Sequence, residues 1–128
     1  MPDADYLFVY GTLIRRLRHP MHRRMLRYAS YLCDAVAEGE LFDLGAYPAM
    51  RPGAGRVWGE LYRIEDFTPL FRTLDRYEGS EYERRKIPVR CDGEERVDAW
   101  AYLYRHPLPP SRRIASGSYL AHRREGIR

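Results

Sequence analysis

The residue of this sequence best suited to proton transfer is Glu78, because a helix over residues 69–78 would place its carboxylate beside a buried face. Successive helical residues step about 100° around the axis, so Leu70 and Leu74 share an apolar stripe and Glu78 falls at its edge. Burial disfavours the charged form of a carboxyl group and raises its pKa, which favours general base or acid chemistry near neutral pH. Two other interpretations stay open: Glu78 could turn into water where the helix ends, or pair with Arg84.

A second candidate is the turn Tyr10-Gly11-Thr12-Leu13, which ends the apolar segment 7–10. Glycine can adopt backbone angles that other residues avoid, and the successive N–H groups of such a turn can hold a carboxylate or a developing oxyanion. Thr12 adds a hydroxyl to the same turn. The alternative is an ordinary tight turn without a chemical role.

The helix that carries Glu78 has recognisable start and stop signals. Thr68 is expected to be its N-cap, with Pro69 at the first helical position, where the missing N–H costs no hydrogen bond. Gly79 is expected to end it. A second helix is expected over residues 20–29, with its arginines on the face away from the apolar stripe.

Strands make up most of the remaining chain. Apolar runs and alternating patterns predict strands, Gly39 suggests a bulge, and the glycine- and proline-rich segment 43–55 predicts a loop. Asp92-Gly93 predicts a hairpin between the last two strands. Short connections between strands favour an α+β fold with a curled sheet or small barrel. The expected strands cover residues 7–10, 33–42, 56–64, 82–91 and 96–105.

The length of 128 residues is typical of one domain over residues 1–128, with a core over about 6–120 and a loose basic tail over 121–128. No apolar segment is long enough for a signal sequence or a membrane span, so we expect a cytoplasmic protein. Cys33 and Cys91 are then expected to be reduced thiols, with a disulfide between them as the alternative.

Charge and histidine spacing bear on partners and cofactors. The chain carries 22 basic and 18 acidic residues, for a formal net charge of +4. The basic run over residues 15–27 is typical of a solvated helix face, so no nucleic-acid partner is expected. The four histidines show no ligand spacing on one element, so no metal site is expected. The sequence leaves the oligomeric state open.

Five stretches resemble, in order and spacing, the γ-glutamylcyclotransferase-like family, which includes γ-glutamylamine cyclotransferases and AIG2-like proteins. Each stretch alone is a weak signal, but the five in order are specific. The resemblance covers roughly residues 6–120. The stretches are FVYGTL, LFDLGAYPAM, VWGELYRI, LDRYEGSEYERRKIPV and IASGSYL.

The resemblance implies a small curled mixed β-barrel with flanking helices, and it implies a reaction. In characterised members of the family, the α-amino group of a γ-glutamyl amide attacks its own γ-carbonyl carbon. The products are 5-oxoproline and a free amine or amino acid. The resemblance implies a small-molecule γ-glutamyl substrate and no metal or organic cofactor.

The resemblance also implies site residues. The catalytic carboxylate of the family lies in the motif LDRYEG, so its role as general base and then general acid falls on Glu78. The substrate loop falls on residues 10–13. Tyr82 and the aromatic strand 100–104 are further pocket candidates, with core packing as their alternative, and Tyr119 is a pocket or lid candidate by motif position.

Two alternatives to this function remain open at the level of sequence. The chain could keep the family fold as a small-molecule binding or interaction module without turnover. It could also remove a γ-glutamyl group from a larger metabolite, because the sequence does not determine the size of the pocket.

Overall fold

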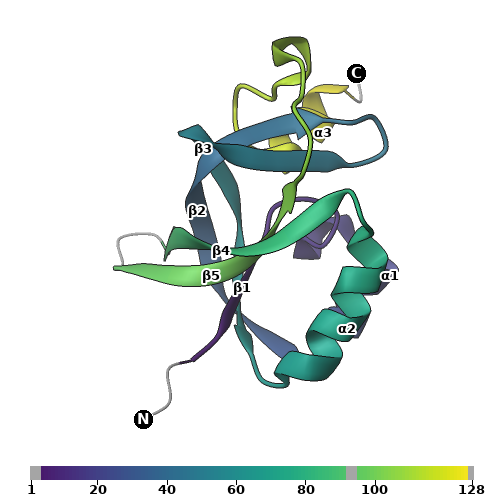
Figure 1. Ribbon diagram of the computed structural model, residues 1–128, viewed down its shortest axis with the longest axis vertical. Coiled ribbons are helices and arrows are strands. Elements are labelled where there is room, and N and C mark those ends of the chain that lie inside the picture. Colours follow the sequence, from purple (N-terminus) through teal and green to yellow (C-terminus); the bar gives the residue numbers. More distant parts are fainter. Residues whose placement is uncertain (1–3, 92–94, 127–128) are drawn as a thin grey trace.

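The computed structural model describes residues 4–91 and 95–126, and within them five strands close into a barrel flanked by helices (Figure 1). The strand order is β1-β3-β2-β4-β5, antiparallel except where β1 runs parallel to β5 at Leu7 and Trp100. The expected α+β class and mixed barrel are confirmed. The elements are β1 (Tyr6–Val9), α1 (Pro20–Met25), β2 (Ala29–Asp43), β3 (Pro48–Ile64), α2 (Phe67–Glu78), β4 (Tyr82–Cys91), β5 (Arg96–Tyr104) and α3 (Tyr119–Gly126), with 3-10 turns at Arg15–Leu17 and Pro110–Arg112.

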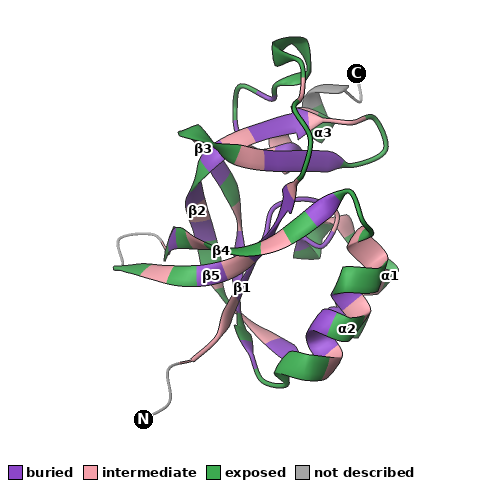
Figure 2. Ribbon diagram, in the orientation of Figure 1, coloured by how far each residue is buried: buried purple, intermediate pink, exposed green. Residues whose placement is uncertain are grey.

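Strand β1 is apolar on both faces because both faces are covered. Phe8 and Tyr10 belong to the cluster that fills the barrel, whereas Leu7 and Val9 belong to a second cluster between the barrel and helices α1 and α2. All four side chains are buried, and Figure 2 shows the buried stretch along β1. This strand therefore leads the chain from the core directly into the turn at residues 10–13.

Helix α2 packs on the outside of the barrel through Leu70, Phe71 and Leu74, as its periodicity predicts. It begins at Phe67, with Asp66 at the N-cap position, so the expected start at Thr68 is wrong by two residues. The proline that follows Thr68 is still tolerated, because the first N–H groups of a helix have no partner within the helix. Gly79 ends the helix with φ of 80°, as expected.

The segment 43–55 is mostly strand and not the expected loop. From Pro48 onward, β3 pairs with the end of β2, for example Met50 with Leu41. Pro52, Gly53 and Gly55 lie opposite Gly39, where the register of the β2–β3 pair shifts between Glu38 and Glu40. That shift confirms the expected bulge, and the sheet absorbs the turn-forming residues there without ending β3.

The C-terminal segment and the cysteines both differ from expectation. The expected loose tail from residue 121 is helical as far as Gly126, and the His122 ring hydrogen-bonds with the Asp43 carboxylate at 2.8 Å, which anchors α3. Cys33 and Cys91 form a disulfide, with 6.0 Å between their Cα atoms. The neighbouring pairing of β2 with β4 brings the two cysteines together.

Two further expectations concern the hairpin between β4 and β5 and membrane-spanning segments. The hairpin expected between β4 and β5 turns at residues 92–94, which lie outside the described residues, although the two flanking strands pair as expected. In the part of the chain that the structure describes, we find no helix of the length and apolar character needed to cross a membrane.

Candidate active site

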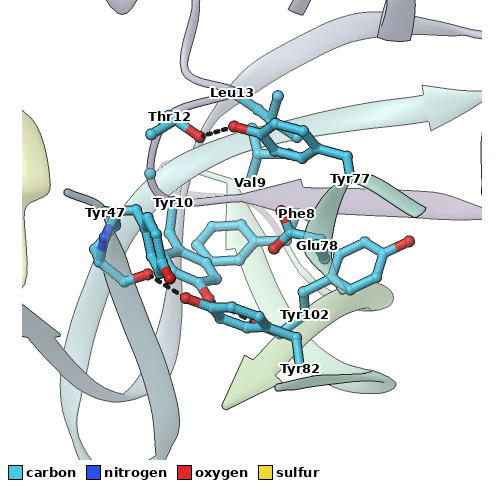
Figure 3. A pocket seen from close by; sticks show the side chains of 12 residues that line it. Phe8, Val9, Tyr10, Thr12, Leu13, Tyr47, Tyr77, Glu78, Tyr82 and Tyr102 are labelled. Atoms are coloured by element: carbon cyan, nitrogen blue, oxygen red, sulfur yellow. Dashed lines mark hydrogen bonds between the residues drawn. The ribbon is translucent and has the colours of Figure 1, made fainter. Parts of the chain in front are cut away.

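A cavity of about 220 Å³ opens where the end of β1 meets the C-terminal end of α2 (Figure 3). Its walls are largely aromatic, and Glu78 is the one charged side chain among the residues that line it. A pocket of this size is at the small end of ligand sites, so it suits a compact group of a few carbons. The lining comes from residues 8–13, Tyr47, Pro48, Tyr77, Glu78, Tyr82 and Tyr102.

Glu78 enters the cavity from the last turn of α2, and Figure 3 shows its carboxyl group among the aromatic rings. Burial raises the pKa of this carboxyl group from 4.5 to about 7. No hydrogen bond or ion pair to Glu78 is found within the described residues, so nothing there offsets the loss of hydration. Arg84, the alternative partner, pairs with Asp75 at 3.1 Å.

The tyrosines around Glu78 direct their hydroxyl groups elsewhere. Tyr10 donates to the carbonyl oxygen of Tyr102 at 2.6 Å, and Tyr82 donates to the carbonyl oxygen of Pro48 at 3.0 Å. Burial, with a further contribution from the nearby Glu78 charge, raises the pKa of both phenols, so they stay protonated. The hydrogen-bonding capacity of Glu78 therefore remains free for a molecule in the cavity.

The turn at residues 10–13 forms the opposite wall. Its backbone N–H groups at Gly11, Thr12 and Leu13 have no protein acceptor within the described chain. Gly11 does not have a positive φ, so the expected reason for glycine is wrong. The actual reason is space: a Cβ at this position would lie 2.6 Å from Cγ of Pro48.

A second carboxylate, Glu60 on β3, anchors the end of this turn. It is buried, with 4% of its surface exposed. One carboxylate oxygen accepts a hydrogen bond from the backbone N–H of Arg15 at 3.0 Å, and the other accepts one from the Nε–H of Arg15 at 2.8 Å. The Tyr62 hydroxyl also donates to Glu60, at 2.9 Å. Glu60 thereby fixes the chain just after the unpaired N–H groups.

The structure brings most of the expected site residues together. Tyr10, Gly11, Thr12, Leu13, Glu78 and Tyr82 all line the cavity. Of the aromatic strand 100–104, Tyr102 reaches it. Tyr119 is buried in the barrel cluster and is not among the lining residues, so the expected role in the pocket has no support in the geometry.

Sequence reasoning missed Tyr47, Pro48, Tyr77 and Glu60. Tyr47 and Pro48 lie in the segment taken as a loop, although the family-like stretch LFDLGAYPAM contains both. Tyr77 lies in the motif LDRYEG beside Glu78, but the helical pattern gave no sign that its hydroxyl group reaches the cavity. Glu60 gave no local signal, because its partners lie on a distant segment.

Within the described residues, no group of three or more histidine, cysteine, aspartate or glutamate side chains is arranged to hold a metal ion. The chemistry available to the cavity is therefore that of one carboxyl group with a near-neutral pKa, a row of backbone donors and the hydroxyl of Thr12. Together with the fold, this site defines a small mixed barrel with one unpaired carboxyl group that faces a cavity.

Comparisons with known proteins agree with this class. The profile of the family described as "Gamma-glutamyl cyclotransferase, AIG2-like" matches residues 7–121. The "Gamma-glutamylcyclotransferase family protein YtfP" of Escherichia coli is 34% identical over 116 residues, which cover 89% of this chain and 95% of that protein. The chain belongs to the γ-glutamyl cyclotransferase, AIG2-like family.

Solved structures show the same fold. The solution structure of ytfP from Escherichia coli matches with a TM-score of 0.64 at 34% identity, over 92% of this chain and 98% of that one. The crystal structure of an AIG2-like protein from Mus musculus matches with a TM-score of 0.74 at 25% identity, over 99% of this chain and 95% of that one.

Proposed function

We propose that this protein is a γ-glutamyl cyclotransferase that converts a γ-glutamyl amide into 5-oxoproline and a free amine or amino acid. The observation that carries the proposal is Glu78: a carboxyl group with a pKa of about 7 and no protein partner in the described chain, facing a small cavity. Family membership supports the same reaction class.

In the proposed reaction, Glu78 acts first as general base. The α-amino group of the substrate is mostly protonated at neutral pH and must lose a proton before it can attack. Glu78 takes that proton, the amine nitrogen bonds to the γ-carbonyl carbon, and a five-membered ring closes. A carboxyl group whose pKa lies near the working pH is suited to take a proton and to return it.

In the second half of the reaction, Glu78 acts as general acid. It returns the first proton to the nitrogen of the leaving amine as the former amide bond breaks. It then passes the second proton of the new ring nitrogen to the departing amine, which leaves as an ammonium ion, so the carboxylate is regenerated and no water is consumed. The attacking and departing groups belong to one molecule, so a cavity that holds the chain folded supplies much of the rate enhancement.

The turn at residues 10–13 would hold the oxygens of the substrate. The unpaired N–H groups of Gly11, Thr12 and Leu13 are suited to bind either the α-carboxylate or the γ-carbonyl oxygen as negative charge develops on it. No cationic side chain is among the lining residues of the cavity, so these backbone donors are the local source of positive potential.

The test is to incubate the protein with a panel of γ-glutamyl amines and γ-glutamyl dipeptides and to measure 5-oxoproline release. We expect turnover of at least one member of the panel, and Glu78→Gln should lower kcat by about 10²- to 10⁴-fold, the usual contribution of a general base or acid. Glu65→Gln, at an exposed glutamate outside the cavity, is the matched control and should keep full activity.

Full activity of Glu78→Gln would disprove the mechanism. Binding of γ-glutamyl compounds without any 5-oxoproline release would instead favour the alternative, a binding module that keeps the fold. Turnover only of substrates with a large group beyond the γ-amide would favour the other alternative, removal of a γ-glutamyl group from a larger metabolite.

A further inference from the structure

Three hydrogen-bonded side chains join the turn at residues 10–13 to helix α1. The hydroxyl oxygen of Thr12 lies 2.8 Å from the hydroxyl oxygen of Tyr77, and the latter lies 3.4 Å from Nε2 of His19. The His19 ring meets the Tyr77 ring edge-on, with 5.4 Å between centroids. Thr12 and Tyr77 both line the cavity, as Figure 3 shows, whereas His19 is the N-cap residue of α1.

The direction of these hydrogen bonds follows from the His19 end. Nδ1 of His19 accepts the backbone N–H of Met21 at 3.0 Å. A backbone N–H can only donate, so Nδ1 carries no proton and the neutral ring holds its proton on Nε2. Nε2–H then donates to the Tyr77 oxygen, and the Tyr77 hydroxyl donates to Thr12.

The reverse arrangement is less favourable. If Thr12 donated to Tyr77, the phenol oxygen would accept two hydrogen bonds, and its own proton would have no acceptor within the described chain. An unpaired, partly buried donor is costly. In the favoured direction, every proton of the three hydrogen-bonded groups is used except the hydroxyl proton of Thr12, a residue that lines the cavity and has no other side-chain partner within the described residues.

We propose that His19 and Tyr77 are positioning residues that fix the Thr12 hydroxyl as a hydrogen-bond donor to an anionic oxygen of the bound γ-glutamyl group; this inference rests on the proposed function. Thr12 would add a side-chain donor to the backbone donors of Gly11 and Leu13. Because the Tyr77 hydroxyl already donates to its oxygen, the Thr12 hydroxyl is polarised and becomes a stronger donor.

The anionic oxygen has two possible sources. If it is the α-carboxylate, the charge is present before reaction, and loss of the Thr12 donor raises KM and weakens binding of L-glutamate. If it is the γ-carbonyl oxygen, the charge develops only in the transition state, and the loss lowers kcat with KM unchanged. Both results support the proposal and identify the oxygen.

The first arm of the test needs no turnover. Nitrogen-15 NMR of the histidine rings reports which ring nitrogen of His19 carries the proton. We expect the Nε2–H tautomer in the free protein at pH 8. The Nδ1–H tautomer would overturn the proposal, because His19 could then not donate to Tyr77. This arm gives a result even if the protein releases no 5-oxoproline, so the two proposals can fail separately.

The second arm is a double-mutant cycle on the best substrate of the panel. Thr12→Val removes the hydroxyl at nearly constant volume and should lower kcat/KM by about 10²-fold, as expected for one oxyanion donor. Tyr77→Phe should lower it by about tenfold, because the Thr12 hydroxyl remains but is no longer oriented. The double variant should match Thr12→Val alone, since Tyr77 acts through Thr12.

Two further variants test the positioning role. His19→Asn keeps a side-chain acceptor at the N-cap, but its shorter side chain places no donor at the position of Nε2, so it should resemble Tyr77→Phe in kcat/KM without loss of stability. Thr12→Ser keeps the hydroxyl and should stay within about threefold of the original protein. Tyr31→Phe, which removes a tyrosine hydrogen bond outside the cavity, should change nothing.

Independent effects of Thr12→Val and Tyr77→Phe, whose fold-changes multiply in the double variant, would show that Tyr77 does not act through Thr12. Unchanged kcat/KM in Thr12→Val would show that the hydroxyl does not touch the substrate. If no substrate is turned over, calorimetry with L-glutamate and 5-oxoproline replaces kinetics in the same cycle. Equal affinities across all variants, or no measurable affinity in the original protein, would then overturn the proposal.

Discussion

Glu60 holds the chain just after the turn at residues 10–13, Glu78 faces that turn across the cavity, and the protein surrounds these two carboxylates differently. Glu60 is buried and accepts hydrogen bonds from the backbone and side chain of Arg15 and from Tyr62. Glu78 faces a cavity, has no partner in the described chain, and has a pKa raised to about 7 by burial. The same chemical group is thus a fixed anchor at Glu60 and an unpaired group with a near-neutral pKa at Glu78.

The difference shows that burial alone does not leave a carboxylate unpaired. Around Glu60, hydrogen bonds replace the lost water, and Arg15 supplies the opposite charge; the guanidinium pKa of Arg15 is raised, chiefly by its hydrogen bond to Glu60. Around Glu78, the tyrosine hydroxyls are engaged elsewhere, so the lost water is not replaced. The carboxylate oxygens of Glu78 therefore remain available to a molecule bound in the cavity.

The largest expected effect is on the pH dependence of activity. If Glu78 acts as base with a pKa of about 7, kcat/KM should rise by roughly 50-fold between about pH 5 and pH 7 and by about twofold more before it levels off above about pH 8. The carboxyl group must be deprotonated to accept the substrate proton, which gives the sign. The measurement is 5-oxoproline release at low substrate concentration, and a profile flat across this range would contradict the assignment.

The next effect concerns the anchor. Glu60→Gln should lower the free energy of unfolding by about 3 kcal/mol, because the amide has no charge and leaves at least one buried donor without an acceptor. Urea denaturation at pH 7 measures it. Asp34→Asn removes the exposed second partner of Arg15 and should cost less than about 0.5 kcal/mol. Equal effects of the two substitutions would remove the distinction between anchor and surface charge.

Glu78→Gln should have the opposite sign. The pKa of Glu78 is higher in the folded protein than its ordinary value of 4.5. Between pH 4.5 and about pH 7, the folded state therefore binds more protons than the unfolded state. The contribution of Glu78 to stability is therefore greatest below about pH 4.5 and falls as the pH rises toward about 7.

At pH 8 the glutamine variant should be more stable than the original protein by about 2 kcal/mol, and near pH 4 the two should be equally stable. We set this figure below the full value of the pKa shift because water in the cavity hydrates part of the carboxylate. Urea denaturation across this pH range measures the difference. A glutamine variant that is less stable at pH 8 would mean that Glu78 has a partner that stabilises its charge.

The smallest effect is expected at Tyr62, which donates one of the hydrogen bonds to Glu60. Tyr62→Phe should cost about 1 kcal/mol of stability, because the bonds from Arg15 to Glu60 remain. It should leave kcat unchanged, since Tyr62 does not line the cavity. Thermal unfolding and the activity assay together check this. A fall in kcat would mean that Glu60 also affects the conformation of the turn at residues 10–13.

Prediction from sequence worked where the signal is local. The position of Glu78 at the edge of a helix face follows from the helical period alone, and the structure bears it out. It failed where turn-forming residues lie in a paired strand, as in segment 43–55. It also gave no signal for Glu60, whose burial depends on Arg15 from the segment that follows β1.

The sequence by itself determined the helix that carries Glu78, the apolar strand before Gly11, and the family to which the chain belongs. Only the tertiary structure brought the two together, as the hydrogen bond between Thr12 and Tyr77 shows across 65 residues of sequence. Helical and strand periods depend on backbone geometry over a few residues. The loss of water around a carboxylate depends instead on every group that closes over it, and barrel closure brings those groups from distant parts of the chain.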